Sequence, residues 1–164
     1  MPIELYRIDD RLIHGQVVVG WGQPLDLGFI VLVDDEVAAS EWEQELYRMG
    51  VPPQMDVYFD SVEDAARRHA DYAADARPGI LLTGDIDTMR RFADAVGGLR
   101  RVNLGGIHHR AGRRQRMRYV FLDQAEEEAL RAFAARGVLI SAQDVPAANP
   151  VPLAEVLDGR GDSL

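Results

Sequence analysis

Residues 28–33 have the sequence Gly-Phe-Ile-Val-Leu-Val, a run without any polar or charged side chain. A strand with one face in water alternates apolar and polar residues, whereas a strand of a parallel sheet is covered on both faces and is apolar throughout. The run therefore predicts a buried parallel strand, and with it an α/β fold in which helices cover both faces of the sheet.

The segments on either side of this run alternate between strand and helix patterns. Residues 3–8 alternate with period two, and further short stretches favour strands at 55–59, 80–83, 101–104, 118–122 and 138–143. Helical patterns lie between the strands, over residues 15–23, 37–49, 61–76, 89–96, 123–136 and 153–158. Ser40 and Glu43 form a capping-box pattern, and Asp123 is the expected cap of the helix that follows it.

Strands that alternate with helices are joined by right-handed crossovers and form a parallel sheet. The sequence therefore predicts a single domain over residues 1–164, with an open, mainly parallel sheet of about seven strands and helices on both faces. Residues 145–164 begin with a proline-rich stretch, and we expect them to be a C-terminal extension that packs on this domain.

The composition excludes several classes of function. Hydrophobic residues make up 47% of the 164 residues and charged residues 27%, which is typical of a folded globular chain. The chain has no cysteine, so disulfides, zinc thiolates and thiol nucleophiles are excluded. Its N-terminus lacks a signal-peptide pattern, and no apolar run has membrane-spanning length. The net charge of −9 argues against general binding to nucleic acid.

The basic residues are unevenly distributed along the chain. The segment 100–118 holds seven arginines and no acidic residue, in a chain that is acidic overall. This segment is either a solvated basic loop or a surface that meets phosphate or an acidic partner, and the charge alone favours neither interpretation.

One histidine lies where a ligand is expected. In open parallel sheets, ligands bind at the carboxyl ends of the strands, and His14 follows the first predicted strand. A phosphate acceptor needs a nucleophile, a cation for the phosphoryl oxygens, free backbone amides and an acceptor that orients the ring. These groups are supplied by His14, by Arg11, by the amides of Gly15 and Gln16, and by either Asp9 or Asp10. The same residues also fit an ordinary surface ion pair.

The other histidines favour structural interpretations. His69 falls on the apolar face of its predicted helix, where it is expected to pack against neighbouring side chains. His108 and His109 are adjacent in a glycine- and arginine-rich loop without a nearby acid. Adjacent histidines alone do not form a good chelate, so we expect no metal site.

A longer run around His14 carries a family resemblance. Residues 7–17, Arg-Ile-Asp-Asp-Arg-Leu-Ile-His-Gly-Gln-Val, resemble the active-site loop of IIB components of sugar phosphotransferase systems in the mannose/fructose/sorbose family. Further resemblances are Trp21, residues 33–38, Pro52-Pro53 and residues 102–108, so that the likeness covers nearly the whole chain. It implies an α/β fold with a central, mostly parallel sheet and phosphorylation at His14.

The resemblance also implies a relay at the inner face of the membrane, carried out by a cytoplasmic protein. A phosphoryl group arrives from a phosphohistidine on a IIA protein or domain, rests on His14, and passes to a sugar bound by membrane IIC and IID subunits. The activity is that of a protein-N-phosphohistidine–sugar phosphotransferase, and it needs neither a metal nor another cofactor. The carrier atom is expected to be Nδ1, and a homodimer is one option for the assembly.

Site residues take the following roles on this interpretation. His14 is the nucleophile and carrier, Arg11 clamps the phosphoryl group, and Asp10 orients the ring. Gly15 and Gln16 contribute amides to phosphate binding, and Thr83 contributes a hydroxyl from the neighbouring strand end. The alternatives are that Arg11 only pairs with Asp9, and that Thr83 only caps the next helix.

Three other functions are compatible with parts of the sequence. The protein is alternatively a regulatory phosphocarrier without sugar transport, which one chain cannot distinguish from the transport role. A phosphatase-like or nucleotide-binding enzyme lacks its expected signals, since the chain has no Gly-x-Gly-x-x-Gly, no Walker loop and no Arg-His-Gly. An interaction module that uses the basic segment would not need His14.

Overall fold

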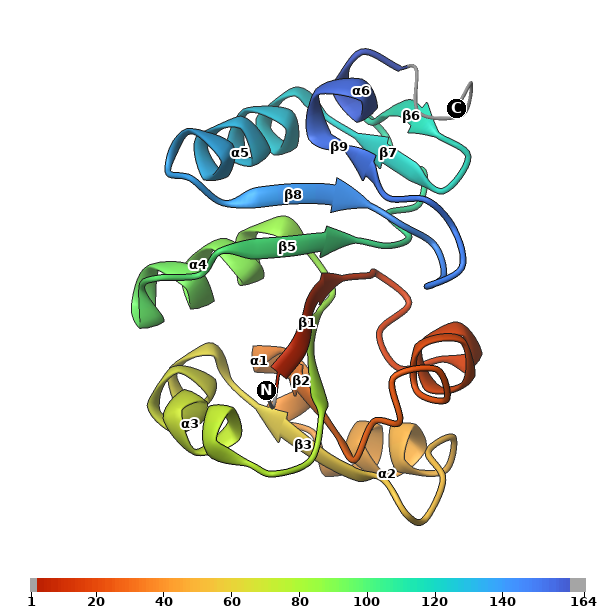
Figure 1. Cartoon of the computed structure of the whole chain (residues 1–164), viewed down its shortest axis with the longest axis vertical. Helices are drawn as coiled ribbons and strands as arrows, with labels where there is room; N and C mark the ends of the chain where they lie inside the picture. The colour runs from red at the N-terminus through yellow and green to blue at the C-terminus, as the bar shows by residue number, and fades with distance from the viewer. Residues whose placement is uncertain (1–2, 160–164) are drawn as a thin grey trace.

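The computed structural model describes residues 3–159. A single seven-stranded sheet forms the centre of the molecule, with strand order β3-β2-β4-β1-β5-β8-β9 (Figure 1). All neighbouring strands pair in parallel except β9, which is antiparallel to β8. This confirms the predicted α/β fold with an open, mainly parallel sheet. In the order of the sheet, the strands are Asp56–Asp60, Phe29–Val33, Gly79–Thr83, Ile3–Ile8, Arg101–Leu104, Leu139–Ala142 and Val151–Pro152.

Apolar residues of alternating strand positions fill two separate cores. On β2, Phe29, Val31 and Val33 belong to one core, and Ile30 and Leu32 belong to the other. All five residues are fully buried, because each face of the strand is covered. The unbroken apolar run from which the fold was predicted therefore has the expected physical cause.

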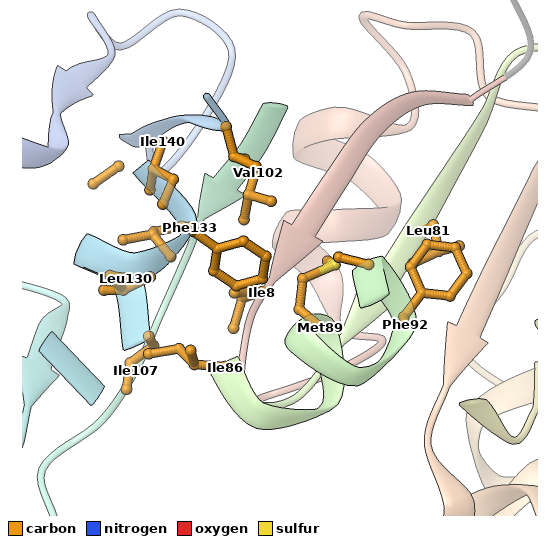
Figure 2. Packing of buried hydrophobic residues seen from close by; sticks show 14 of the residues in the cluster. Ile8, Leu81, Ile86, Met89, Phe92, Val102, Ile107, Leu130, Phe133 and Ile140 are labelled. Carbon is orange, nitrogen blue, oxygen red and sulfur yellow. The ribbon is translucent and has the colours of Figure 1, made fainter. Parts of the chain in front are cut away.

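The larger core lies under four helices, and the smaller core lies on the opposite face of the sheet. The larger core contains residues of α3 (Val62–Ala74), α4 (Ile86–Val96), α5 (Gln124–Ala135) and α6 (Leu153–Leu157). Figure 2 shows its centre, where Met89 of α4 lies between Phe133 on one side and Phe92 and Leu81 on the other. The smaller core is closed by a short π-helix, η1 (Gln16–Trp21), and by α1 (Asp35–Ala38).

Side-chain caps fix the starts of most helices. Ser61, Asp85 and Asp123 each accept a hydrogen bond from a backbone amide in the first turn of α3, α4 and α5. Asp123 and Glu126 complete a capping box, as two reciprocal bonds between side chain and backbone. The predicted box at Ser40 is wrong, because the side chain of Ser40 makes no capping bond.

The helix predicted over residues 37–49 is in fact two short helices. Asp34 caps α1 by accepting from the amide of Val37 at 2.9 Å, and α2 (Glu41–Arg48) begins after a break at Ser40. The side chain of Gln44 donates to the carbonyls of Val37 and Ala38 at 3.1 Å each, so the end of α1 is satisfied without a continuous helix.

The number of strands in the sheet agrees with the sequence prediction, but one member differs. The predicted strand at 118–122 is β7 (Val120–Leu122), which pairs with β6 (Arg114–Met117) in a separate antiparallel hairpin. The seventh strand of the main sheet is β9, in the proline-rich segment. Pro152 is tolerated there because β9 is an edge strand, where a missing amide leaves no bond unmade.

The chain segments that follow the strands leave an open edge of the sheet at the carboxyl end of β1. The chain leaves β1 for η1 on one face of the sheet, whereas α4 and α5 cover the other face after β4 and β7. Connections that depart to opposite faces leave a crevice at the carboxyl ends of the strands. The loop containing His14 lies at this edge (Figure 1).

Candidate active site at the carboxyl edge of the sheet

The loop after β1 is held in an unusual backbone conformation. Leu12 has a φ of 58°, which is a strained value for a residue with a branched side chain. Its side chain is buried in the smaller core, and its amide bonds the carbonyl of Asp9 at 3.0 Å. Burial and this tight turn together hold the conformation, which aims the carbonyl of Leu12 at the His14 ring.

His14 lies at the predicted edge of the sheet, with most of its side chain buried. Its side chain is 19% exposed, and its Nδ1 donates to the carbonyl of Leu12 at 2.9 Å. Its Nε2 makes no hydrogen bond within residues 3–159 and lies 3.9 Å from Oδ2 of Asp9. Both ring nitrogens thus face oxygen acceptors. The carbonyl of His14 accepts from the amides of Val17 and Val18, which ties the residue to η1.

Asp9 is the carboxylate that faces the His14 ring. It is fully buried, and it accepts from the guanidinium of Arg11 through two bonds of 3.2 Å and from the amide of Arg11 at 3.1 Å. Arg7 donates a further bond of 3.2 Å. Burial by itself raises the pKa of Asp9, but the two guanidiniums outweigh it and hold the pKa below its ordinary value. Asp9 is therefore ionised.

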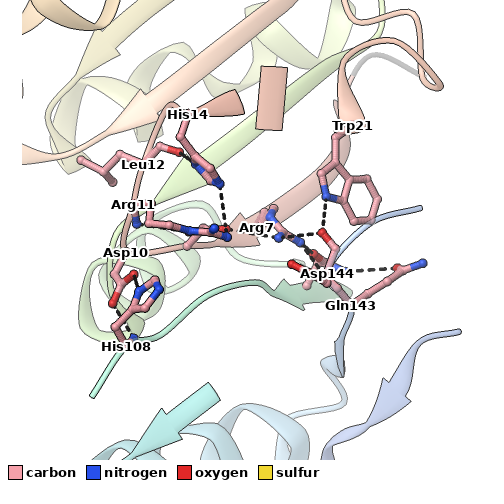
Figure 3. Close-up of polar contacts among 11 residues, drawn as sticks. Arg7, Asp10, Arg11, Leu12, His14, Trp21, His108, Gln143 and Asp144 are labelled. Atoms are coloured by element: carbon pink, nitrogen blue, oxygen red, sulfur yellow. Dashed lines mark hydrogen bonds and ion pairs between the residues drawn. The ribbon is translucent and has the colours of Figure 1, made fainter. Parts of the chain in front are cut away.

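Asp10, the predicted ring orienter, contacts a different histidine. Its two oxygens accept from Nδ1 of His108 at 2.5 Å and from the amide of His108 at 2.7 Å (Figure 3). Asp9 lies two residues after Arg7 and pairs with it, whereas Asp10 contacts the loop after β5. Asp9, the other aspartate considered from the sequence, occupies the place expected for Asp10.

Arg7 is a central part of the site that the sequence prediction missed. The side chain is fully buried, and it donates to the side chain of Asn103 and to the carbonyls of Gln143 and Asp144. The guanidinium carbon of Arg7 lies 5.0 Å from the centre of the Trp21 ring, and the indole Nε1 of Trp21 donates to the carbonyl of Asp144 (Figure 3). A signal was present, since period two places Arg7 on the same strand face as the apolar Leu5.

A glycine makes room for this buried ion pair. A Cβ at Gly105 would overlap the guanidinium of Arg7 and the carboxylate of Asp9. Gly106 is also close, because a Cβ there would lie 3.2 Å from atoms of both Arg11 and His108. The Gly-Gly pair after β5 thus allows the backbone to approach the polar site.

The remaining predicted site residues occupy different surroundings. Gly15 is the N-cap of η1, with an ordinary φ of −53°, and no atom lies within 4 Å of the position that a Cβ would take there. Gln16 begins η1. Thr83 is fully buried, and its hydroxyl donates to the carbonyl of Asp85 at 3.2 Å. That hydroxyl is therefore used within the turn before α4, close to the alternative considered from the sequence, while Asp85 itself caps the helix.

The basic segment divides into paired and exposed arginines. Arg113 makes two bonds to Glu126, and Arg116 makes bonds to both oxygens of Glu127. These pairs attach the hairpin to α5. The other five arginines of the segment have exposed side chains: 100, 101, 110, 114 and 118. Only part of the predicted basic surface is therefore available to a partner.

The described part of the chain offers neither a metal centre nor a membrane span. Among residues 3–159, no group of three histidine, aspartate or glutamate side chains is arranged to hold a metal ion. No helix in the same range combines the length and apolarity needed to cross a membrane.

The fold and the site define an α/β protein with a mainly parallel sheet and a loop histidine whose ring faces a carboxylate that is paired with two arginines. The chain belongs to the family of sorbose-subfamily IIB components of the phosphotransferase system, whose model matches residues 3–163. The predicted family is therefore confirmed, and with it membership of a class of phosphotransferases that take part in sugar uptake.

Named relatives support this membership. The chain is 34% identical to the sorbose-specific EIIB component of Klebsiella pneumoniae over 92% of this chain and 91% of the relative. It is 34% identical to the mannose-specific EIIAB component of Escherichia coli K12 over 88% of its length, but it spans only 45% of that longer protein. The solved N-acetylgalactosamine-specific IIB component 1 of Escherichia coli superposes with a TM-score of 0.84, at 31% identity over 91% of this chain and 97% of that one.

Proposed function

We propose that the protein is a phosphocarrier that accepts a phosphoryl group on His14 from a phosphohistidine of a IIA protein or domain. It then passes the group to a sugar during uptake through a membrane permease of IIC and IID subunits. It works in the cytoplasm, peripheral to the inner face of the membrane. The observation that carries this proposal is the position of His14 beside the Arg11–Asp9 pair at the carboxyl edge of the sheet.

Acceptance of the group requires a nitrogen lone pair on His14. In the structure, the Nδ1 of His14 donates to the carbonyl of Leu12, and Nε2 is buried against Asp9. We infer that donor docking breaks the bond to Leu12, so that the proton resides on Nε2 and the lone pair on Nδ1. A bond then forms between Nδ1 and phosphorus as the donor's phosphorus–nitrogen bond breaks. Asp9 stabilises the positive ring through the proton on Nε2.

Arg11 is suited to the transferring group. Its side chain is 33% exposed, whereas the Arg7 side chain is fully buried, so an incoming phosphoryl group reaches Arg11 first. A guanidinium stabilises the charge on the equatorial oxygens in the transition state. The amides of Gly15 and Gln16, at the start of η1, are the proposed donors to the remaining oxygens.

The experiment is a two-stage transfer assay. The purified protein is incubated with a phosphorylated IIA protein, and its intact mass is measured at alkaline pH, because phosphohistidine is acid-labile. Phosphorylated protein is then mixed with membranes containing the IIC and IID subunits and with sorbose, mannose or N-acetylgalactosamine.

His14→Gln should abolish the gain of one phosphoryl group, while His69→Gln and His109→Gln should retain it. Continued phosphorylation of the His14 variant would overturn the proposed carrier site. Retention of the phosphoryl group in the presence of every sugar would instead overturn the transport role alone.

A further inference from the structure

A second histidine at the same edge is held as firmly as His14. Three hydrogen bonds fix His108: its Nδ1 and its amide donate to Asp10, and its carbonyl accepts from Arg113 at 2.9 Å. Its side chain is nevertheless 55% exposed. One nitrogen of the ring is therefore fixed by a hydrogen bond, while much of the ring surface is accessible to a molecule that binds from solvent.

The partner of Nδ1 determines what the other nitrogen of His108 offers. An ionised carboxylate only accepts hydrogen bonds, so Nδ1 carries the proton in the bond to Asp10. In the neutral ring, Nε2 then has a lone pair, and it makes no hydrogen bond to any residue between 3 and 159. An acid that fixes the tautomer of a histidine, leaving Nε2 free to take a proton, is the arrangement of a general base.

The position of His108 relates it to the phosphoryl site. Its Cε1 and the guanidinium of Arg11 each come within 3.2 Å of the same point above Gly106. Figure 3 shows His14, Arg11 and His108 in succession, with Arg11 between the two rings. The proposed clamp of the phosphoryl group, Arg11, therefore lies next to His108, so an acceptor that approaches a phosphoryl group at Arg11 comes close to the His108 ring.

We infer that His108, oriented by Asp10, is the general base for the acceptor step, an inference that rests on the proposed transfer to sugar. The hydroxyl oxygen of the sugar forms a bond to phosphorus while the bond between phosphorus and Nδ1 of His14 breaks. The hydroxyl proton goes to Nε2 of His108. His14 leaves as a neutral imidazole that keeps its proton on Nε2, beside Asp9. His108 acts as a catalytic residue, and Asp10 is its positioning residue.

The two half-reactions differ in their need for a base. An imidazole that attacks through its lone pair has no proton to lose, whereas a hydroxyl must lose one. His108 therefore has a role in the second half-reaction and none in the first. If the Asp10–His108 pair only held the two loops together, its loss would instead affect both half-reactions and the unfolding temperature.

The test measures both half-reactions on wild type, His108→Gln, Asp10→Asn and the matched control His109→Gln. His109 is the exposed neighbour of His108, and its ring lies edge-on against Phe121. We expect all four proteins to accept phosphoryl from phospho-IIA at similar rates. Transfer to sugar, in the presence of membranes with IIC and IID, should be about 100-fold slower or worse for His108→Gln, as for loss of a general base. Asp10→Asn should be slowed to a lesser extent, and His109→Gln should match wild type.

Chemical rescue separates catalysis from structure. Added imidazole should restore part of the sugar transfer of His108→Ala, because it supplies the missing base, and should leave wild type unchanged.

The inference is overturned if His108→Gln passes phosphoryl to sugar at the wild-type rate, or if the variant is slowed equally in both half-reactions. Failure of the wild type itself to accept or to pass the group would be a failure of the proposed function and not of this residue alone.

Discussion

Gly105→Ala should destabilise the protein through the buried ion pair of the site. The backbone at Gly105 does not adopt a positive φ, so an alanine there costs nothing in backbone strain. Its methyl group, however, would overlap the guanidinium of Arg7 and the carboxylate of Asp9, both of which are fully buried. Neither side chain has open space into which it can move without losing hydrogen bonds.

The size of the effect follows from these contacts. Overpacking of a close-packed interior costs about 1–3 kcal/mol. Displacement of a buried charge from its partner adds to this, since complete loss of one partner costs about 3–5 kcal/mol. We therefore expect a loss of about 2–4 kcal/mol in unfolding free energy for Gly105→Ala. In a chain of this length, that corresponds to a decrease of roughly 5–15 °C in Tm.

Thermal unfolding followed by circular dichroism measures the effect, with Gly15→Ala as the matched control. Gly15 has an ordinary φ and no neighbouring atom within 4 Å of an added Cβ, so the control should unfold within about 0.5 kcal/mol of wild type. The reasoning about a tightly enclosed ion pair is refuted if the Tm of Gly105→Ala lies within about 2 °C of the Tm of the control. A difference of that size corresponds to roughly 0.5–1 kcal/mol in unfolding free energy.

Two further predictions concern charge and pH. Replacement of the exposed Arg110 and Arg114 by glutamate should slow phosphoryl transfer from phospho-IIA at low salt. The difference in rate from wild type should shrink as the salt concentration rises, because charges at the rim of an interface act on the encounter rate and are screened by salt. The same reversal of Arg100 and Arg101, at the amino end of β5, should have little effect, and equal deficits would contradict steering by the carboxyl edge. Burial lowers the pKa of His69 in the folded state below its value in the unfolded chain, which is about 6.5. The unfolded state therefore binds more protons, and the free energy of unfolding falls as the pH drops below about 6.5. Chemical denaturation of His69→Gln between pH 5 and 8 should show a shallower fall than wild type, and parallel curves would argue against this assignment.

The sequence predicted those features that depend on local chemistry. The run at 28–33 identified a strand buried on both faces, and Asp123 identified the start of α5. The position of His14 at the carboxyl edge followed from the strand before it. In each case the deciding residues lie within a few positions of one another, so their pattern is visible without knowledge of the partners.

The features that the sequence did not predict depend on distant contacts. Arg7 is buried because Asn103 of β5 and the residues just after β8, Gln143 and Asp144, approach it from far away in the chain. The choice between Asp9 and Asp10 depends on their partners, since Asp9 pairs with two arginines and Asp10 bonds His108 in the loop after β5. The hairpin strand β6 has a polar sequence, Arg-Gln-Arg-Met, and it forms because β7 pairs with it.

The balance of charge gives a reason for a carboxylate inside a site that is to hold phosphate. Arg7 and Arg11 carry two positive charges and Asp9 carries one negative charge, so the resting cluster has a single positive charge. On the proposed function, a phosphoryl dianion on a protonated His14 ring would bring a single negative charge, and the loaded cluster would then be neutral. Without Asp9, the buried Arg7 would lose its counter-ion, and the stronger positive field would stabilise the phosphorylated ground state. A carrier must release its group as readily as it accepts it, and stabilisation of the ground state slows the release. Asp9 thus makes a buried arginine tolerable and, on the proposed function, limits how tightly the site would retain the phosphoryl group.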